Sequence, residues 1–352
     1  MTLTAHTSML VILISSCVLL SGCVGYYGQL IVGQLALFSA HKPISAILED
    51  PNQDPQLQAR LAKVLEARDF ASTHLGLPNN NSYREYADLQ RNYVVWNVFA
   101  TPEFSVDPIK HCFPITGCVA YRGYFKEQDA HNKATELKAQ HMDTLVAGVD
   151  AYSTLGWFSD PLINTMLRRN DDQLAALIFH ELTHQMLYVQ GDTAFNESYA
   201  SFVEREGQRQ WRAYQGLPPL QTDRVKAYRQ MVEEILATRE RLRVLYATAL
   251  PEEDMRTRKQ AEFTRLRQTH RRLKEQEWGG RGYFDQWFKQ PLNNAALLPF
   301  GLYDQWVPAF AQLFQQVHGD WPAFHAAVAR LGKLAPAERT STLERLLQEA
   351  KP

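Results

Sequence analysis

The spacing of apolar residues predicts a mostly helical chain with one short region of strands. Segments with helical spacing or composition cover residues 25–39, 54–74, 125–141, 174–188, 195–215, 304–317, 321–332 and 336–350. Runs of β-branched and aromatic residues at 92–100 and 119–125, with a mixed run at 144–156, predict strands. A short helix over 162–167 is expected to lead into the helix at 174–188. We therefore expect an α+β fold, in which a small mixed or antiparallel sheet packs on that helix.

Two further segments, 221–248 and 252–278, are rich in charged residues and are separated by Leu250-Pro251. Proline interrupts a helix because its ring clashes with the preceding turn, so we expect two long helices folded back on each other as an exposed hairpin. The predicted apolar seam of this hairpin consists of Val225, Tyr228, Met231, Ile235, Leu242 and Leu245. A solvated structural arm is the simplest interpretation of the hairpin.

Length and composition fit one large globular domain. The chain has 352 residues, of which 45% are hydrophobic, enough for a sizeable core. We expect a single domain over 23–352, with a sheet-containing lobe at about 90–190 and a helical lobe at about 191–352. The formal net charge is −1 and no basic block stands out, so nucleic acid is not an expected partner.

The N-terminus carries an apolar run, Met9–Leu20, that is short for a membrane span. Leu20-Ser21-Gly22-Cys23 follows and resembles the lipobox of bacterial lipoproteins. This resemblance implies that residues 1–22 are a removed signal peptide and that Cys23 carries the lipid. An uncleaved anchor and a buried N-terminal helix are the alternatives. Because residue 24 is Val rather than Asp, the sorting of lipoproteins in general favours the outer membrane, with the protein facing the periplasm.

Apart from Cys17 and Cys23, the cysteines are Cys112 and Cys118, which flank a Pro-Ile-Thr-Gly turn. Their separation suits a local disulfide in an oxidising compartment. The alternative is a pair of zinc thiolates, but zinc knuckles use a gap of roughly two to four residues. The sequence therefore favours the disulfide.

The strongest chemical signal is the H-E-x-x-H pattern formed by His180, Glu181 and His184. Residues four apart lie on one face of a helix, so both imidazoles can reach one metal ion, with Zn²⁺ the expected cofactor. Glu181 can then take a proton from a water that the metal activates. Asn170 begins the predicted helix as a cap and Gly191 ends it. The alternative interpretation is a pair of ordinary core histidines.

A catalytic zinc site needs a third protein ligand, and Glu197 on the following helix is the first choice. The Asn196-Glu197 pair followed by small residues resembles the third-ligand helix of the gluzincin metallopeptidases. Asp192 is the alternative ligand, although it can equally be a turn residue. Glu204 is expected to support a ligand or the fold, or to bind a substrate amine.

The remaining parts of a peptidase site are less specific in the sequence. Tyr303, in a predicted loop, is the first choice for the hydroxyl that stabilises an oxyanion. Its competitors are Tyr121, Tyr124, Tyr152 and Tyr283. An extended substrate could pair with an edge strand just before the metal helix, which points to Gly148, Tyr152 and Ser153 as substrate-binding residues. An internal strand is the equal alternative.

Several segments together resemble a family of bacterial lipoproteins known as putative aminopeptidases. They are HLGLPNNNSY, CFPITGCVAYRGYF, AYSTLGWFSDP, HELTHQ, FNESYASFVEREG and WVPAF. The resemblance implies a zinc metallopeptidase with a zincin-like core, acting on peptide or protein substrates and held at the membrane by the lipid on Cys23. Two other functions stay open. One is an endopeptidase of envelope proteins, and the other is a non-catalytic scaffold or binding lipoprotein that zinc stabilises.

Overall fold

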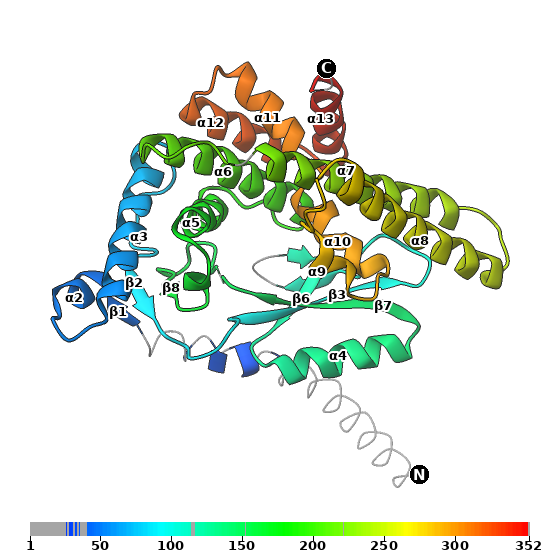
Figure 1. The fold of residues 1–352 in the computed structure, drawn as a ribbon, viewed down its shortest axis with the longest axis horizontal. Coiled ribbons are helices and arrows are strands. Elements are labelled where there is room, and N and C mark those ends of the chain that lie inside the picture. Colours follow the sequence, from blue (N-terminus) through cyan, green and yellow to red (C-terminus); the bar gives the residue numbers. More distant parts are fainter. Residues whose placement is uncertain are drawn as a thin grey trace, which may run out of the picture.

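The computed structural model describes residues 26, 28–30, 32, 33, 35, 41–113, 117–151, 153–220 and 222–350. The fold is α+β and mostly helical, as predicted, with short strands in small sheets (Figure 1). The signal peptide over 1–22, the lipid site Cys23 and the substrate-binding candidate Tyr152 lie outside the described residues. The zincin-like core and the division into two lobes stay predictions.

The central sheet has the strand order β6-β3-β7, with β3 at Val95–Pro102, β6 at Tyr121–Tyr124 and β7 at Met142–Val149. Both pairings are antiparallel, and Phe99 lies opposite Tyr121 on one side and Leu145 on the other. Residues alternate between the two faces of a strand. The sheet therefore presents two different apolar faces to the rest of the chain.

Each face of the central sheet is covered by one helix (Figure 1). Trp96, Val98 and Ala100 pack with the inner side of α4, Glu127–Ala139. Phe99 packs on the opposite face with α10, Asn294–Tyr303. Because α10 also contacts α6, Thr193–Tyr214, it connects the sheet to the metal helix region.

The predicted metal helix is α5, Asp171–Met186, which packs along α6 and α3, Pro55–Thr73. The Asn170 side chain caps α5 as predicted, because it accepts a hydrogen bond from the backbone N of Gln173 at 2.9 Å. The apolar residues of α5 belong to the largest core cluster, and Ile178, Phe179 and Leu182 are fully buried. This burial fixes the rotation of α5 about its axis.

The other elements surround this core. At the N-terminal end they are β1 His41–Pro43, α2 Ile44–Glu49, β2 Glu85–Ala87, β4 His111–Phe113, β5 Gly117–Val119, β8 Leu162–Ile163 and the 3₁₀ helix η1 Met166–Arg168. At the C-terminal end they are α7 Thr222–Tyr246, α8 Glu252–Gln276, α9 Asp285–Phe288, α11 Val307–Gln316, α12 Trp321–Gly332 and α13 Pro336–Glu349. Among the residues that the structure describes, none of the helices combines the length and apolar character that a membrane span requires.

The hairpin formed by α7 and α8 is confirmed, but its predicted seam is only partly correct. Met231, Ile235 and Leu242 are fully buried between the helices and their neighbours. Val225 is exposed, so its place in the seam was wrong. Tyr228 lies outside the seam too, because its hydroxyl donates a hydrogen bond to Asp304 at 3.1 Å.

Three predicted boundaries near the metal helix were also wrong. The strand expected over 144–156 ends at Val149, because Leu155 and Gly156 have positive φ angles of 55° and 81° that no strand accommodates. The helix expected over 162–167 is instead strand β8 followed by η1. Helix α5 ends at Met186, before Gly191, because the chain becomes extended at Leu187.

Candidate metal centre

His180, His184 and Glu197 converge on one point between α5 and α6. The two histidine Nε2 atoms lie 3.2 Å apart, and Oε2 of Glu197 lies 3.3 Å from Nε2 of His180 and 3.4 Å from Nε2 of His184. All three residues are buried. A tetrahedral ion with bonds of about 2.0–2.2 Å separates its ligand atoms by roughly 3.3–3.6 Å, so this donor set fits a small divalent metal such as zinc.

The turn between α5 and α6 explains why Glu197 reaches the histidines. Asn196 accepts a hydrogen bond from the backbone N of Val189 and donates one to its carbonyl, both at 2.8 Å. Gly191 adopts a φ of 80° in this turn, a backbone conformation that residues with a Cβ rarely adopt. The chain therefore reverses tightly, and the first turn of α6 lies against the last turns of α5.

Asp192, the alternative third ligand, does not belong to the centre. One of its carboxylate oxygens caps α6 by accepting from the backbone N of Phe195 at 3.1 Å. The other accepts a charged hydrogen bond from Nε of Arg339 at 2.8 Å. Asp192 therefore caps the N-terminus of α6 and pairs with Arg339 of α13.

Glu204 supports one of the two histidines. Its Oε2 lies 3.0 Å from Nδ1 of His180, the ring nitrogen that faces away from the centre. Histidine ligands of metals are commonly held this way, because the carboxylate fixes the tautomer and the ring orientation. His184 differs, because its Nδ1 is buried without a hydrogen-bond partner among the described groups.

The charges at the centre are strongly coupled. Burial lowers the pKa of His180, but the hydrogen bonds to Glu197 and Glu204 outweigh it and raise the pKa to about 10. Burial raises the pKa of Glu197, but the neighbouring His184 and the hydrogen bonds from both histidines lower it to about 2. The Glu197 carboxylate is therefore ionised, as a metal ligand must be. Burial raises the pKa of Glu181, the residue expected to act as the base.

Two of the candidate tyrosines line the centre. Tyr303 is the last residue of α10 rather than part of a loop, and its ring stacks on that of His180 with centroids 6.0 Å apart. Tyr121, the first residue of β6, has its pKa raised well above 10.0 by burial and by the charge of Glu197. The pKa of Tyr303 is raised in the same way, by burial, the charge of Glu197 and a hydrogen bond to it. Both phenols therefore stay protonated at neutral pH.

Two other candidate tyrosines lie away from the centre, whereas one tyrosine that was not a candidate lies next to it. Tyr124 packs on the α4 face of the sheet and Tyr283 packs in the α7–α8 hairpin cluster. Tyr188, just after α5, lies next to the centre, since its ring centroid is 6.5 Å from that of His184. Burial and the charge of Glu197 raise its pKa to about 12. Its position one turn beyond His184 is a signal that could have identified it.

The predicted substrate-binding residues Gly148 and Ser153 lie in a strand and in the loop that follows it. Gly148 is in β7, paired with Trp96, and a Cβ there would lie 2.5 Å from the ring of Tyr93. Ser153 is in the following loop, and its hydroxyl donates to Asp160 at 3.2 Å. Gln185, the residue after His184, also donates to Asp160, at 2.9 Å, and so ties this loop to α5. This link was not predicted, because Gln185 and Asp160 are far apart in the chain.

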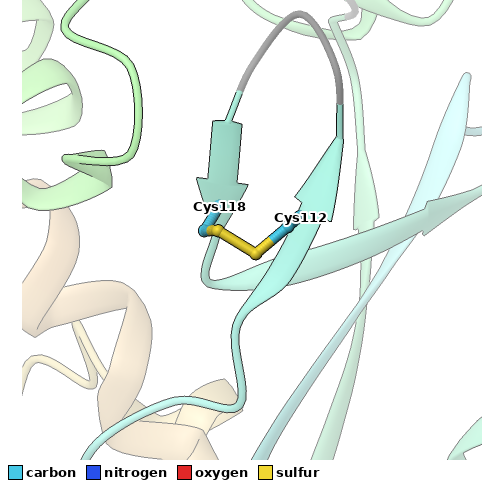
Figure 2. Close-up of a disulfide and its surroundings, with 2 residues drawn as sticks. All are labelled: Cys112 and Cys118. Atoms are coloured by element: carbon cyan, nitrogen blue, oxygen red, sulfur yellow. A yellow bond between two sulfur atoms is a disulfide. The ribbon is translucent and has the colours of Figure 1, made fainter.

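The disulfide predicted between Cys112 and Cys118 is present and closes the β4–β5 hairpin (Figure 2). Its two cysteines lie opposite each other in the antiparallel pair. A Cβ at Gly117 would lie 2.5 Å from Cγ of Gln190, so the hairpin packs closely against the turn between α5 and α6. This contact places a covalently closed element next to the metal centre.

Comparisons with known proteins give one match. No curated protein matches the chain, and no solved structure matches it either. A family model described as "Putative aminopeptidase" matches residues 25–343, which is most of the chain and includes all three potential ligands. The chain belongs to this putative aminopeptidase family.

Proposed function

We propose that this protein hydrolyses peptide bonds with the help of a zinc ion held by His180, His184 and Glu197. The main support for this proposal is that three buried potential ligand atoms converge, and that Glu181 is adjacent to His180 on the same helix. A zinc ion held there would polarise the scissile carbonyl and make a water molecule acidic enough to attack it. The family to which the chain belongs supports peptide bonds as the substrate.

The chain's own groups provide the remaining chemistry. Glu181 takes the proton of the attacking water and passes it to the leaving nitrogen, a role suited to a carboxylate whose pKa burial raises. Glu204 keeps the His180 ring in the tautomer that directs Nε2 to the centre. Tyr303 and Tyr121, which keep their protons, can donate hydrogen bonds to the oxyanion that forms at the carbonyl.

The test compares the wild type with Glu181→Gln. The variant should keep zinc, because Glu181 is not a ligand, and should lose at least about 100-fold in kcat, because the proton transfer lacks its acceptor. Glu275→Gln, an exposed change on α8, is the control and should match the wild type. Peptidase activity that survives in Glu181→Gln would contradict the mechanism.

Cleavage of peptides with free and with acetylated N-termini distinguishes an aminopeptidase from an endopeptidase. As an aminopeptidase, the enzyme should cleave only the free form and release single residues, which mass spectrometry detects. Cleavage of acetylated peptides at internal bonds would identify an endopeptidase instead. Zinc content without cleavage of either set would favour a structural zinc site.

We further propose that the protein is anchored by a lipid on Cys23 and faces the periplasm. Support comes from the segment Leu20-Ser21-Gly22-Cys23 and from the disulfide, which suits an oxidising compartment. Labelling with radioactive palmitate should mark the wild type and not Cys23→Ser. Equal labelling of both proteins would refute the anchor.

A further inference from the structure

Tyr83 carries a buried hydroxyl that the proposed mechanism does not yet use. Its side chain is 1% exposed and lies in the main core cluster. The hydroxyl has no hydrogen-bond partner among the residues that the structure describes. A buried polar group without a partner is costly, so its presence calls for a function or for a partner that binds there.

The loop before Tyr83 holds this side chain rigidly. Arg68, which is fully buried, donates hydrogen bonds to the carbonyls of Pro78, Asn80 and Ser82 at 2.6, 3.0 and 3.0 Å. Tyr83 itself has a φ of 64°, in the left-handed region that side chains rarely occupy. Its backbone N donates to the carbonyl of Asp160 at 2.7 Å. The loop therefore maintains a strained conformation that directs one phenol into the core.

The same loop lies against the face of α5 that carries Glu181. Gln185 donates to Oγ of Ser82 at 3.1 Å, and its side-chain oxygen accepts from Asn80 at 2.8 Å. Residues four apart share one face of a helix, so Glu181 lies one turn before Gln185 on that face. The contacts of Asn80 and Ser82 thus bring this loop, and Tyr83 with it, close to the face of α5 that carries Glu181.

Charges and hydrogen bonds favour Glu181 over Asp160 as the acceptor of a hydrogen bond from the Tyr83 hydroxyl. Besides burial, the charge of Glu181 has the largest influence in raising the pKa of Tyr83, ahead of Asp160. The Asp160 carboxylate is already engaged, since it accepts from the hydroxyl of Thr154 at 2.7 Å and from Gln185 at 2.9 Å. The Glu181 carboxylate, in contrast, accepts no hydrogen bond from a side chain among the described groups.

We propose that Tyr83 is a positioning residue, whose hydroxyl donates a hydrogen bond to Glu181, directly or through one water, and holds the carboxylate toward the substrate. This inference rests on the proposed peptidase function. A fixed donor limits the rotation of the carboxylate, so that one oxygen stays aimed at the attacking water.

The test replaces only the hydroxyl. Tyr83→Phe should lower kcat roughly 10- to 100-fold, as loss of a supporting hydrogen bond does, with KM and zinc content unchanged. Its melting temperature should fall less than that of Tyr199→Phe, because among the described groups the Tyr83 hydroxyl makes no hydrogen bond besides the proposed one to Glu181. Combined with Glu181→Gln, it should cause no further loss, since the residue acts through Glu181.

Tyr199→Phe is the matched control, because Tyr199 is equally buried and its hydroxyl bonds Nδ1 of His325 at 2.6 Å. This variant should lose stability and keep kcat. An unchanged kcat in Tyr83→Phe, beside an inactive Glu181→Gln, would overturn the role of Tyr83 and leave the peptidase intact. A melting temperature that falls as far in Tyr83→Phe as in Tyr199→Phe would also overturn it, by revealing a structural partner. A wild type without peptidase activity would refute the function and this inference together.

Discussion

At the scale of single residues, the affinity for zinc should depend on Glu204 as well as on the three ligands. Glu204→Gln removes the charge that faces Nδ1 of His180 at 3.0 Å. We expect zinc affinity to fall roughly 10- to 100-fold, because the carboxylate increases the basicity of the ring and fixes its orientation. Competition with a coloured chelator measures this. Glu206→Gln, on the same helix but paired with Arg209, is the control, and equal affinity in both variants would contradict the role of Glu204.

His325 should make the stability of the protein depend on pH. Its Nε2 donates to the carbonyl of Leu75 at 2.8 Å, and its Nδ1 lies 2.6 Å from the Tyr199 hydroxyl, which donates to it when the ring is neutral. Burial accordingly lowers its pKa below 6.5, although the bond to Leu75 acts in the opposite direction. The folded state thus resists protonation, whereas the unfolded state accepts it near pH 6.5.

The sign of the His325 effect follows from this lowered pKa. The stability that neutral His325 contributes is complete above pH 6.5 and is lost as the pH falls through the lower folded-state pKa. His325→Gln should cost about 1–3 kcal/mol at pH 7.5 and should narrow the difference in unfolding free energy between pH 7.5 and pH 5. Urea unfolding at both values measures this. His131→Gln, an exposed change, should behave as the wild type, and an unaltered pH difference in His325→Gln would disprove the account.

Residues that carry chemistry were predictable where one local pattern contained them. His180, Glu181 and His184 share a single helix, and Glu197 follows after a short turn. Tyr83 and Asp160 were not predictable, because their relation to α5 depends on Gln185 reaching two loops at once, at 3.1 Å and 2.9 Å. Tertiary hydrogen bonds of this kind leave no periodic trace in a sequence.

At the scale of elements, the turn between α5 and α6 should control the metal centre through Asn196. Asn196→Ala leaves the backbone N and carbonyl of Val189 without their 2.8 Å partners. We expect a loss of about 2–3 kcal/mol in unfolding free energy, together with weaker zinc retention, because Glu197 is the next residue. Asn132→Ala, an exposed change on α4, should cost less than about 0.5 kcal/mol. Full zinc retention in Asn196→Ala would show that the turn does not position Glu197.

Element boundaries were less predictable than the elements themselves. Helices α3, α5, α6 and α8 follow from apolar spacing and capping, because those signals are local. The end of α5 at Met186 does not follow from local signals. The chain becomes extended at Leu187, and the backbone N of Val189 donates a hydrogen bond to Asn196 instead of continuing the helix. Strand β8 escaped prediction as well, because only its parallel pairing with β2 distinguishes two apolar residues from a helical turn.

At the scale of the whole molecule, the centre lies where separate parts of the chain meet. Helix α5 carries two of the potential ligands and α6 carries the third, whereas Tyr303 lies on α10 and Tyr121 on β6. The hydroxyl of Ser198 on α6 donates to the carbonyl of Leu302 at 3.0 Å and accepts from the backbone N of Trp306 at 3.2 Å, which fixes the end of α10. The sequence predicted the α+β class and pointed to Glu197 and Tyr303, but not to the strand order or the path of α10, because both depend on long-range packing.

Removal of zinc should therefore destabilise the molecule as a unit. A ligand that binds only the folded state stabilises it by about 2.7 kcal/mol at 100 times its Kd, which corresponds to roughly 4 °C in melting temperature for a domain of this size. We expect a strong chelator to lower the melting temperature of the wild type by this amount and excess zinc to restore it. His184→Ala should melt at one temperature with or without the chelator, because two of the three ligand atoms hold the ion poorly. Equal chelator effects on the wild type and on His184→Ala would place the stabilising metal elsewhere. Because an ion held by these residues would join α5 to α6, the shift should appear equally in the far-ultraviolet signal of the helices and in tryptophan fluorescence.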